Sequence, residues 1–227
     1  MRAVTRRAIV LADGDGPDRA ALDDAWPGWS EEIGLVVAAD GGARLAEPLG
    51  LAVDRWVGDA DSVEPDRLSA LRAAGVPVRV VARDKDESDT ELALLEALQA
   101  GAEDVTIIGG LGGRRIDHAL ANLGLLAHPA LGSHPVRLLD AAARVTLLRG
   151  PGESTLQGRP GDLVSLLPYG GPAIGVVTAG LRYPLAGETL SVGPPRGLSN
   201  VRLGAVASVR LRDGLLLIVE TPARLAT

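Results

Sequence analysis

Short apolar runs alternate with longer helical patterns from Arg7 to about Leu126. The apolar runs have the length and continuity of strands that are buried on both faces of a sheet. They cover residues 8–12, 34–40, 55–59, 76–82 and 104–110. Apolar residues at helical spacing cover residues 64–75, 88–101 and 116–128. Strands that alternate with helices predict a mostly parallel sheet with helices on both faces, a Rossmann-like α/β domain of three layers.

The pattern changes after about Leu131, where proline and glycine become frequent and the helical periodicity is lost. Short apolar runs separated by turn residues are typical of an antiparallel sandwich or barrel. They cover residues 136–140, 144–150, 162–168, 173–180, 188–193, 204–212 and 214–220. We therefore expect two domains, residues 1–132 and 133–227.

Composition narrows the class of protein. The net charge is −6 and the isoelectric point is about 5.1, which argues against a nucleic-acid partner because such binders usually carry a basic face. The chain has no cysteine, so disulfides and thiolate metal sites are excluded. No apolar run reaches the roughly 18 residues of a membrane span, and the first residues do not read as a signal peptide. We expect a cytoplasmic protein with no membrane partner.

Acidic and glycine residues follow four consecutive predicted strands. Asp40-Gly41-Gly42 follows the second strand, and Gly58-Asp59-Ala60-Asp61 follows the third. The other two endings are residues 84–89, which hold Lys85, Asp86 and Asp89, and the glycine-rich residues 109–115, followed by Asp117 and His118. Because open parallel sheets bind ligands beyond the carboxyl ends of their strands, we expect these residues at one site.

Asp59 and Asp61 are the first candidates for metal ligands. An extended backbone would direct both side chains to the same side. Two neighbouring carboxylates repel each other unless a cation or a proton separates them. Mg²⁺ typically uses one or two carboxylates together with substrate phosphates. The alternative is an ordinary turn in which Asp61 or Ser62 caps the next helix.

The next two strand endings also have two interpretations each. Ser88 or Asp89 can cap the helix that follows, which leaves Asp86 without that role, while Lys85 can neutralise the acids or reach a phosphate. The glycine-rich turn lets backbone N–H groups approach a phosphate at the positive end of a helix, with Arg114 and Arg115 beside it. It could also be simply a flexible turn, since neither the Walker A nor the dinucleotide-binding spacing is present.

Several motifs in this order resemble the thiamine pyrophosphokinase family, especially its bacterial members. They are ADGGA (39–43), GDADS (58–62), KDESDTE (85–91), GGRRIDHALANL (112–123), GLRYPL (180–185) and GLSN (197–200). The resemblance implies an α/β catalytic domain that binds ATP and Mg²⁺, and a C-terminal β-sandwich that binds thiamine and forms a homodimer with the site at the subunit interface. The implied reaction transfers a pyrophosphoryl group from ATP to the thiamine hydroxyl, giving thiamine diphosphate and AMP.

The resemblance also implies roles for individual residues. The implied catalytic residues are Asp40, Asp59, Asp61, Asp89 and Asp117. The implied metal ligands are Asp59, Asp61, Asp86 and Asp89. The implied ATP-binding residues are Gly41, Gly42, Lys85, Gly112, Gly113, Arg114, Arg115 and His118. The implied thiamine-binding residues are Tyr183, Ser199 and Asn200. Either Asp40 or Asp89 could accept the proton of the attacking hydroxyl.

Two departures from the family pattern stand out. Ala60 replaces the usual phenylalanine between the paired aspartates, and we expect its side chain to point away from both of them. Arg114-Arg115 replaces a single arginine, which leaves open which one contacts phosphate.

Three other functions compete with this interpretation. A pyrophosphokinase of the same fold could act on another alcohol, such as a hydroxymethyl pterin. A metal-dependent glycosyltransferase also uses an Asp-x-Asp pair. A catalytically inactive protein could bind thiamine or a nucleotide as a regulator.

Overall fold

The computed structural model describes residues 7–61 and 63–225. Ser62, one of the two residues that could cap the following helix, lies outside the described residues. The chain divides into two compact units between Ala141 and Ala142, rather than after residue 132 as the sequence predicts. Among the described residues, no helix has the length and apolar character needed to cross a membrane.

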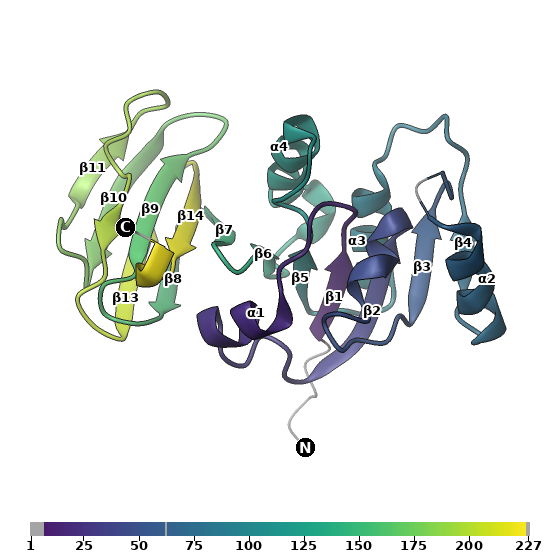
Figure 1. The fold of residues 1–227 in the computed structure, drawn as a ribbon. Coiled ribbons are helices and arrows are strands. Elements are labelled where there is room, and N and C mark those ends of the chain that lie inside the picture. Colours follow the sequence, from purple (N-terminus) through teal and green to yellow (C-terminus); the bar gives the residue numbers. More distant parts are fainter. Residues whose placement is uncertain (1–6, 62, 226–227) are drawn as a thin grey trace, which may run out of the picture. The chain divides into compact units, whose positions relative to one another are not determined.

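Parallel strands form the sheet of the first unit, in the order β6-β5-β1-β2-β3-β4 (Figure 1). Each strand runs parallel to its neighbour in that order. The bounds are β1 Arg7–Leu11, β2 Ile33–Ala39, β3 Arg55–Gly58, β4 Val78–Val80, β5 Asp104–Ile108 and β6 Val136–Leu139. The predicted α/β fold is confirmed, and its parallel sheet brings the carboxyl ends of these strands to one edge.

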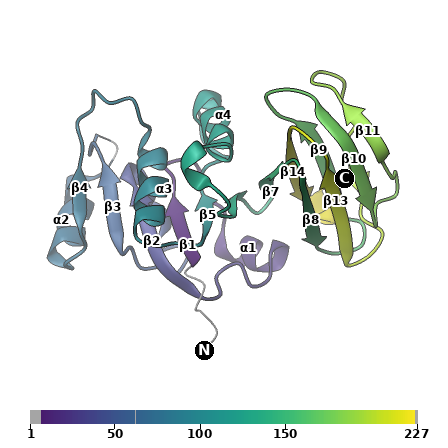
Figure 2. The same cartoon turned by 180° about the vertical axis from the view of Figure 1, so that it is seen from behind.

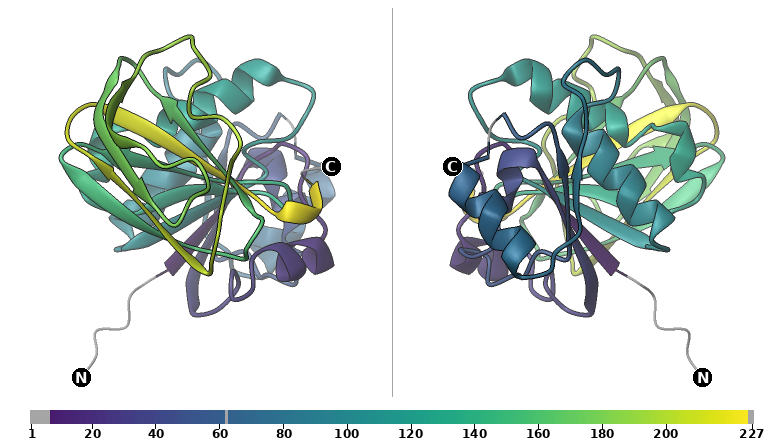
Figure 3. Two further views of the ribbon diagram at one scale, coloured as in Figure 1. Left: turned by 90° about the vertical axis from the view of Figure 1, so that its left-hand side faces the viewer. Right: turned by 90° about the vertical axis from the view of Figure 1, so that its right-hand side faces the viewer.

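Helices cover both faces of this sheet (Figures 1 and 2). The bounds are α1 Arg19–Ala25, the 3₁₀ helix η1 Asp40–Leu45, α2 Pro65–Ala73, α3 Asp89–Gln99, α4 Ile116–Leu125 and the 3₁₀ helix η2 Pro129–Leu131. Leu22 of α1, Ala43 of η1 and Leu68 of α2 pack with alternate strand residues such as Ile9 in one apolar core. Helix α3 packs on β1, β2 and β3 and also contacts α4. The view along the sheet in Figure 3 (right) shows the resulting three layers.

Local sequence explains where α3 begins. Ser88 is its N-cap, and the hydroxyl oxygen accepts a hydrogen bond from the backbone N–H of Glu91 at 3.1 Å. Of the two capping residues that the sequence allows, Ser88 therefore takes the role. Asp89 becomes the first residue of the helix, and its carboxylate is available for another function.

The strand order reverses between β1 and β5. From β1 the chain adds β2, β3 and β4 on one side, and then returns to place β5 and β6 on the other side. Such a reversal separates the loops that follow the two central strands, and ligands of open α/β sheets bind at this point. The loops after β1 and β5 therefore lie at the expected position for a nucleotide.

The second unit is a sandwich of antiparallel strands, as predicted (Figure 3, left). One layer has the order β12-β9-β14-β7 and the other β11-β10-β13-β8. The bounds are β7 Arg144–Arg149, β8 Gly152–Gln157, β9 Leu163–Pro168, β10 Ala173–Ala179, β11 Ala186–Leu190, β12 Asn200–Val201, β13 Val206–Leu211 and β14 Leu215–Thr221, followed by the 3₁₀ helix η3 Ala223–Leu225. Residues from both layers, including Val164, Val176, Val209 and Ile218, form one core.

Several elements differ from the expectation for physical reasons. Residues 136–140 were expected in the second domain, but β6 pairs in parallel with β5, which moves the boundary to 141/142. Strand β4 is shorter than predicted and partly exposed, because it is the edge strand of its sheet. The pattern did not predict α1, a helix of seven residues, or the strands β8 and β12.

Candidate active site

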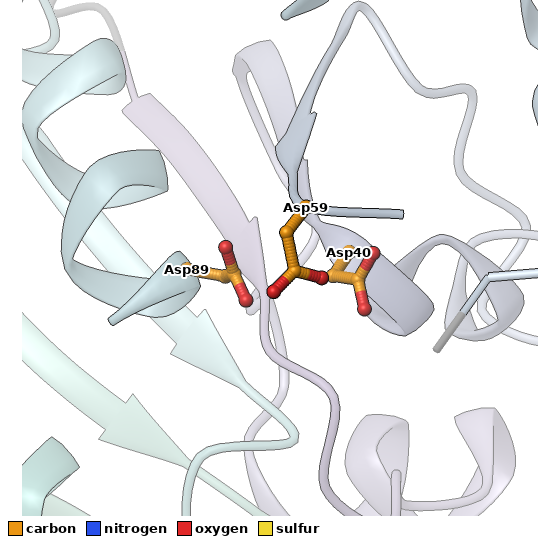
Figure 4. Close-up of side chains that lie close together, drawn as sticks. All are labelled: Asp40, Asp59 and Asp89. Atoms are coloured by element: carbon orange, nitrogen blue, oxygen red, sulfur yellow. The ribbon is translucent and has the colours of Figure 1, made fainter. Parts of the chain in front are cut away.

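Carboxylates from three successive strand ends meet at the edge of the parallel sheet (Figure 4). Asp40 follows β2 as the first residue of η1, Asp59 follows β3, and Asp89 is the first residue of α3. One carboxylate oxygen of each residue lies within 4.8 Å of the others. We call these three residues the carboxylate cluster. The structure thus brings together three of the acidic residues that the sequence singled out.

The position of Asp40 is fixed by β3. The indole Nε1 of Trp56 donates a hydrogen bond to the Asp40 carbonyl oxygen at 2.9 Å, and the backbone N–H of Ala60 donates to Asp40 Oδ1 at 3.2 Å. Asp40 is only 2% exposed. A Cβ atom at Gly58 would lie 2.8 Å from the Cβ of Asp40, so the close approach of β3 requires glycine there.

The backbone after Asp59 turns sharply and is not extended. Ala60 has a φ of +67°, in the left-handed region that residues with a Cβ atom rarely adopt. The backbone N–H of Asp61 consequently donates to Asp59 Oδ1 at 3.0 Å, as in an Asx turn. The expectation that Asp59 and Asp61 point to the same side from an extended strand is therefore wrong.

Asp61 lies outside the carboxylate cluster in this structure. Its side chain is exposed and forms an ion pair with Arg83 at 3.1 Å. Ala60, in contrast, packs against the apolar core of the first unit. The expectation that its side chain points away from both aspartates stays a prediction. Asp86 is also exposed and outside the carboxylate cluster, so metal binding by Asp61 and Asp86 stays a prediction.

Lys85 provides a positive charge beside two members of the carboxylate cluster. Its Nζ lies 3.1 Å from Asp89 Oδ1 and 3.8 Å from Asp59 Oδ2. The closer contact has the distance of an ion pair but not the angles of a hydrogen bond. The buried Oδ1 of Asp89 therefore accepts no hydrogen bond from the residues that the structure describes.

Burial raises the pKa of Asp89 above its ordinary value of 3.8, although the Lys85 ammonium opposes the shift. Repulsion from Asp59 and Asp61 adds to the increase. A raised pKa in the folded state means that the folded protein holds this proton more tightly than the unfolded chain does. Ionised Asp89 therefore costs stability above the raised pKa, and this cost disappears as the pH falls below 3.8. A bound cation would remove the cost at neutral pH.

The residues of the carboxylate cluster fit a hard divalent cation. All the donors are oxygen atoms, as Mg²⁺ prefers. A buried carboxylate oxygen without a hydrogen bond is available to a metal. Asp40, with a φ of +43°, and Ala60 also hold strained backbone conformations here, and such conformations concentrate at functional sites.

Arg115 and Asp117 pair with each other at the beginning of α4. Arg115 Nε donates to Asp117 Oδ1 at 3.1 Å, and a terminal nitrogen of the guanidinium donates to Oδ2. This contact lowers the pKa of Asp117 and raises that of Arg115. Arg114 and His118 are exposed in the same segment. Asp117 does not join the carboxylate cluster, so its predicted catalytic role stays a prediction.

The loop after β1 completes the site's edge, and the sequence interpretation missed it. A Cβ atom at Gly41 would lie 2.2 Å from Asp13 Oδ1, and one at Gly42 would lie 2.2 Å from the Leu11 carbonyl oxygen. A Cβ atom at Gly112 would lie 2.8 Å from the Asp15 carbonyl oxygen. Close packing thus explains these three predicted ATP-binding glycines. At Gly113 the reason is a φ of +109°.

Arg44 of η1 holds the loop after β1 in place. Its guanidinium pairs with the Asp13 carboxylate and donates to the carbonyl oxygens of Gly41, Asp13 and Gly14, each at 2.8–2.9 Å. The signal for the loop was present in the sequence, because the first strand also ends in acidic and glycine residues, ADGDG at 12–16.

In the second unit, the predicted thiamine-binding residues lie around β12. The amide of Asn200 binds the backbone of Tyr183 twice: Tyr183 N–H donates to Oδ1 at 3.0 Å, and Nδ2 donates to Tyr183 O at 2.6 Å. Asn200 is buried, whereas Tyr183 is 58% exposed. Ser199 is exposed and has a φ of +56°. Asn200 thus holds Tyr183 in place, and direct contact of either residue with thiamine stays a prediction.

Comparison with protein families decides the identity of the chain. A family model described as "Thiamin pyrophosphokinase, catalytic domain" matches residues 29–137. A second model, "Thiamin pyrophosphokinase, vitamin B1 binding domain", matches residues 153–216. The chain belongs to the thiamin pyrophosphokinase family. The first match covers the carboxylate cluster, and the second covers Tyr183, Ser199 and Asn200.

Individual relatives agree with this membership. The chain is 25% identical over 195 residues to the thiamine pyrophosphokinase of Bacillus subtilis (strain 168), covering 86% of this chain and 90% of the relative. It resembles the crystal structure of the Bacillus subtilis enzyme with a TM-score of 0.80 and 23% identity, over 96% of this chain and 99% of that one. For a thiamin pyrophosphokinase family protein from Enterococcus faecalis, the TM-score is 0.77 and the identity 25%, over 95% and 98% of the two chains.

Membership of this family makes the chain an ATP-dependent pyrophosphotransferase, a thiamine diphosphokinase with thiamine and ATP as substrates. The comparisons give no support to the alternative of another alcohol as acceptor. The Asp-x-Asp pair also gives no argument for a glycosyltransferase, because Asp61 is separated from the carboxylate cluster.

Proposed function

We propose that the protein is a magnesium-dependent thiamine diphosphokinase whose cation is held by Asp40, Asp59 and Asp89. The observation that carries the proposal is the convergence of three carboxylates, two from strand ends and one from the start of α3, within 4.8 Å. Carboxylates this close in a partly buried site need a counter-charge. Lys85 supplies a single positive charge beside three carboxylates, so further positive charge is needed, and a divalent cation would supply it.

The proposed chemistry needs one bond made and one bond broken. When bound, Mg²⁺ supplies positive charge to the phosphoryl oxygens of ATP. The hydroxyl oxygen of thiamine bonds to the β-phosphorus of ATP, and the bond from that phosphorus to the oxygen bridging the α-phosphate breaks. AMP leaves with the bridging oxygen. Because the reaction is mostly positioning and charge stabilisation, the chain's residues act chiefly by holding the reactants in line.

Asp89 is our choice for the proton acceptor. Its buried Oδ1 accepts no hydrogen bond among the described residues, so one oxygen can face the cation while the other takes the proton, whereas Asp40 Oδ1 already accepts a hydrogen bond from Ala60. The proton of the thiamine hydroxyl would pass to Asp89 as the new bond forms.

The ATP phosphates are proposed to lie between Lys85 and the 109–115 turn. Arg115 at the start of α4 is exposed, and the positive end of that helix favours phosphate. Arg114 and His118 lie in the same segment. A phosphate would compete with Asp117 for the Arg115 guanidinium, whose forked donors match phosphate oxygens. Together these groups would bind the leaving side of ATP.

Removal of Mg²⁺ is expected to abolish the activity. In excess EDTA, thiamine and ATP should remain unconverted, and added Mg²⁺ should restore the reaction, because the phosphate charge would otherwise repel the carboxylate cluster. Mass spectrometry of the products measures this, with AMP and thiamine diphosphate expected. Full turnover in EDTA would contradict the proposed cation site. Bound thiamine with intact ATP in the presence of Mg²⁺ would instead favour the inactive regulator.

We also propose a homodimer in which the second unit of one subunit meets the catalytic unit of its partner. The support is the family resemblance together with large apolar side chains that are more than half exposed in the second unit: Tyr183, Val192, Leu198, Leu203 and Val206. A cytoplasmic location is proposed because ATP is the co-substrate.

The dimer is testable by sedimentation velocity. A mass of about twice 23.3 kDa is expected at micromolar concentration. Leu203→Asp should shift the protein toward monomers and lower activity, because a charge would replace a side chain that is 60% exposed and apolar. Monomers of undiminished activity would contradict a site shared between subunits.

A further inference from the structure

Lys85 is the only lysine in the sequence, and each of the other 22 long basic side chains is arginine. It lies in the loop between β4 and α3, and its side chain is only 13% exposed. The ammonium contacts the carboxylate cluster, at 3.1 Å from Asp89 and 3.8 Å from Asp59. The one position that holds lysine is therefore the one beside the proposed cation site.

The chemistry of lysine differs from that of arginine in a way that matters here. A guanidinium is a rigid planar fork that binds carboxylates through two parallel hydrogen bonds, as Arg137 does with Asp104 at 2.6–2.7 Å. An ammonium is a compact point charge on a flexible stem. It can neutralise a carboxylate without fixed geometry and can move away by rotation of its stem.

We infer that Lys85 is an internal counter-ion that holds Asp59 and Asp89 together in the absence of metal. When metal and nucleotide bind together, the ammonium moves away from these carboxylates. The inference rests on the proposed cation site. A metal ion that takes the same oxygens would repel the ammonium strongly at about 4 Å. The phosphates of ATP offer the displaced ammonium a new partner.

This arrangement couples the binding of metal to that of nucleotide. Free metal ions would have to displace Lys85 without any compensating contact for it, so their affinity is low. With the nucleotide present, the ammonium transfers from carboxylate to phosphate and the metal takes its place. Coupling of this kind is reciprocal, so metal strengthens nucleotide binding by the same factor.

The first test measures the affinity of the metal site for Mn²⁺, which serves as a probe. The concentration of free Mn²⁺ is followed by its electron paramagnetic resonance signal. Without nucleotide, Lys85→Gln is expected to bind Mn²⁺ at least about tenfold more tightly than the wild type, since a neighbouring unit charge is removed. Arg79→Gln is the matched control. It removes the same charge from β4, the strand before the same loop, but Arg79 is 55% exposed and pairs with Glu96. An affinity of Lys85→Gln equal to that of Arg79→Gln would overturn the inference.

The second test uses the wild-type protein and does not depend on the folding of a variant. Protein grown with ¹³C-labelled lysine should give a single side-chain Cε–Hε signal, because the sequence has one lysine. Mg²⁺ with a non-hydrolysable ATP analogue is expected to shift that signal, and Mg²⁺ alone at the same concentration is expected to leave it in place. A signal that stays in place with both present would overturn the inference.

Failure of the inference is distinguishable from failure of the proposed function. If Mn²⁺ does not bind the wild type even with the ATP analogue, the proposed cation site is wrong and the inference falls with it. If Mn²⁺ binds with the analogue but Lys85→Gln gains no affinity for the free ion, only the role of Lys85 is wrong.

Discussion

Asp59→Asn is expected to lower kcat by about 10³-fold or more while the protein stays folded, because a metal site that stabilises phosphoryl charge supplies several kcal/mol. Asp59 lies between Asp40 and Asp89 in the view of Figure 4. It also contacts the Lys85 ammonium, at 3.8 Å. Asparagine keeps the oxygen that accepts the Asp61 N–H, and therefore preserves the turn.

The measurement is steady-state formation of AMP at saturating Mg²⁺, with the thermal unfolding midpoint recorded for each variant. Asp84→Asn is the control, since it removes an exposed carboxylate from the loop before α3 and should change kcat less than about twofold. Near-normal turnover of a folded Asp59→Asn would remove the carboxylate cluster from catalysis.

Asp61→Asn extends this experiment to the residue that the structure leaves outside the carboxylate cluster. The family resemblance implies that Asp61 is a metal ligand. We expect a loss of about a hundredfold, because the loop would turn Asp61 from Arg83 onto the cation. Near-normal turnover would show that Asp61 stays paired with Arg83 during the reaction and does not bind the cation.

The sequence predicted the members of the carboxylate cluster because their positions follow from a topological rule. Carboxyl ends of parallel strands share one edge of a sheet, so acidic residues after β2 and β3 and at the start of α3 had to come close. The direction of Asp61 was not predictable in the same way. It depends on the positive φ of Ala60, which is set by the packing of its methyl group and by the hydrogen bond to Asp40.

The fold was predictable wherever periodicity is strong. The long apolar patterns gave α3, α4 and the central strands close to their observed bounds, since burial on two faces leaves a continuous apolar run. A helix of one or two turns such as α1 leaves too short a pattern, and its N-cap Asp18 is one of many aspartates. The domain boundary was displaced because β6 carries the same short apolar pattern as the strands after it, and only its partner β5 assigns it to the first unit.

Ion pairs between distant parts of the chain were beyond the sequence interpretation, and the most buried one among the described residues lies in the sandwich. Arg202 is 1% exposed and Glu220 3%. Arg202 donates to Glu220 Oε1 at 2.7 Å and to the Leu156 carbonyl oxygen at 2.8 Å, while Arg144 donates to Glu220 Oε2 at 2.8 Å. No local pattern specifies these partners, because they come from four separate segments. The pair anchors the segment that carries Asn200, two residues before Arg202.

Arg202→Met is expected to lower the free energy of unfolding of the second unit by about 3 kcal/mol, because removing one partner leaves a buried charge incompletely compensated. The chain offers separate probes for its units. The tryptophans, Trp26, Trp29 and Trp56, lie in the first unit, and the tyrosines, Tyr169 and Tyr183, lie in the second. In urea, the tyrosine-detected transition should therefore shift while the tryptophan-detected transition stays.

Two further variants separate the cost of an unpaired charge from simple loss of a side chain. Arg210→Met removes an arginine from β13 whose pair with Glu153, at 3.7 Å, is exposed, and it should change stability by less than about 0.5 kcal/mol. Replacing both Arg202 and Glu220 with methionine should recover much of the loss, because Arg144 is a quarter exposed and can turn toward water. A double variant as unstable as the sum of its single variants would mean that the packing of these side chains, and not their charge, holds the segment that carries Asn200 in place.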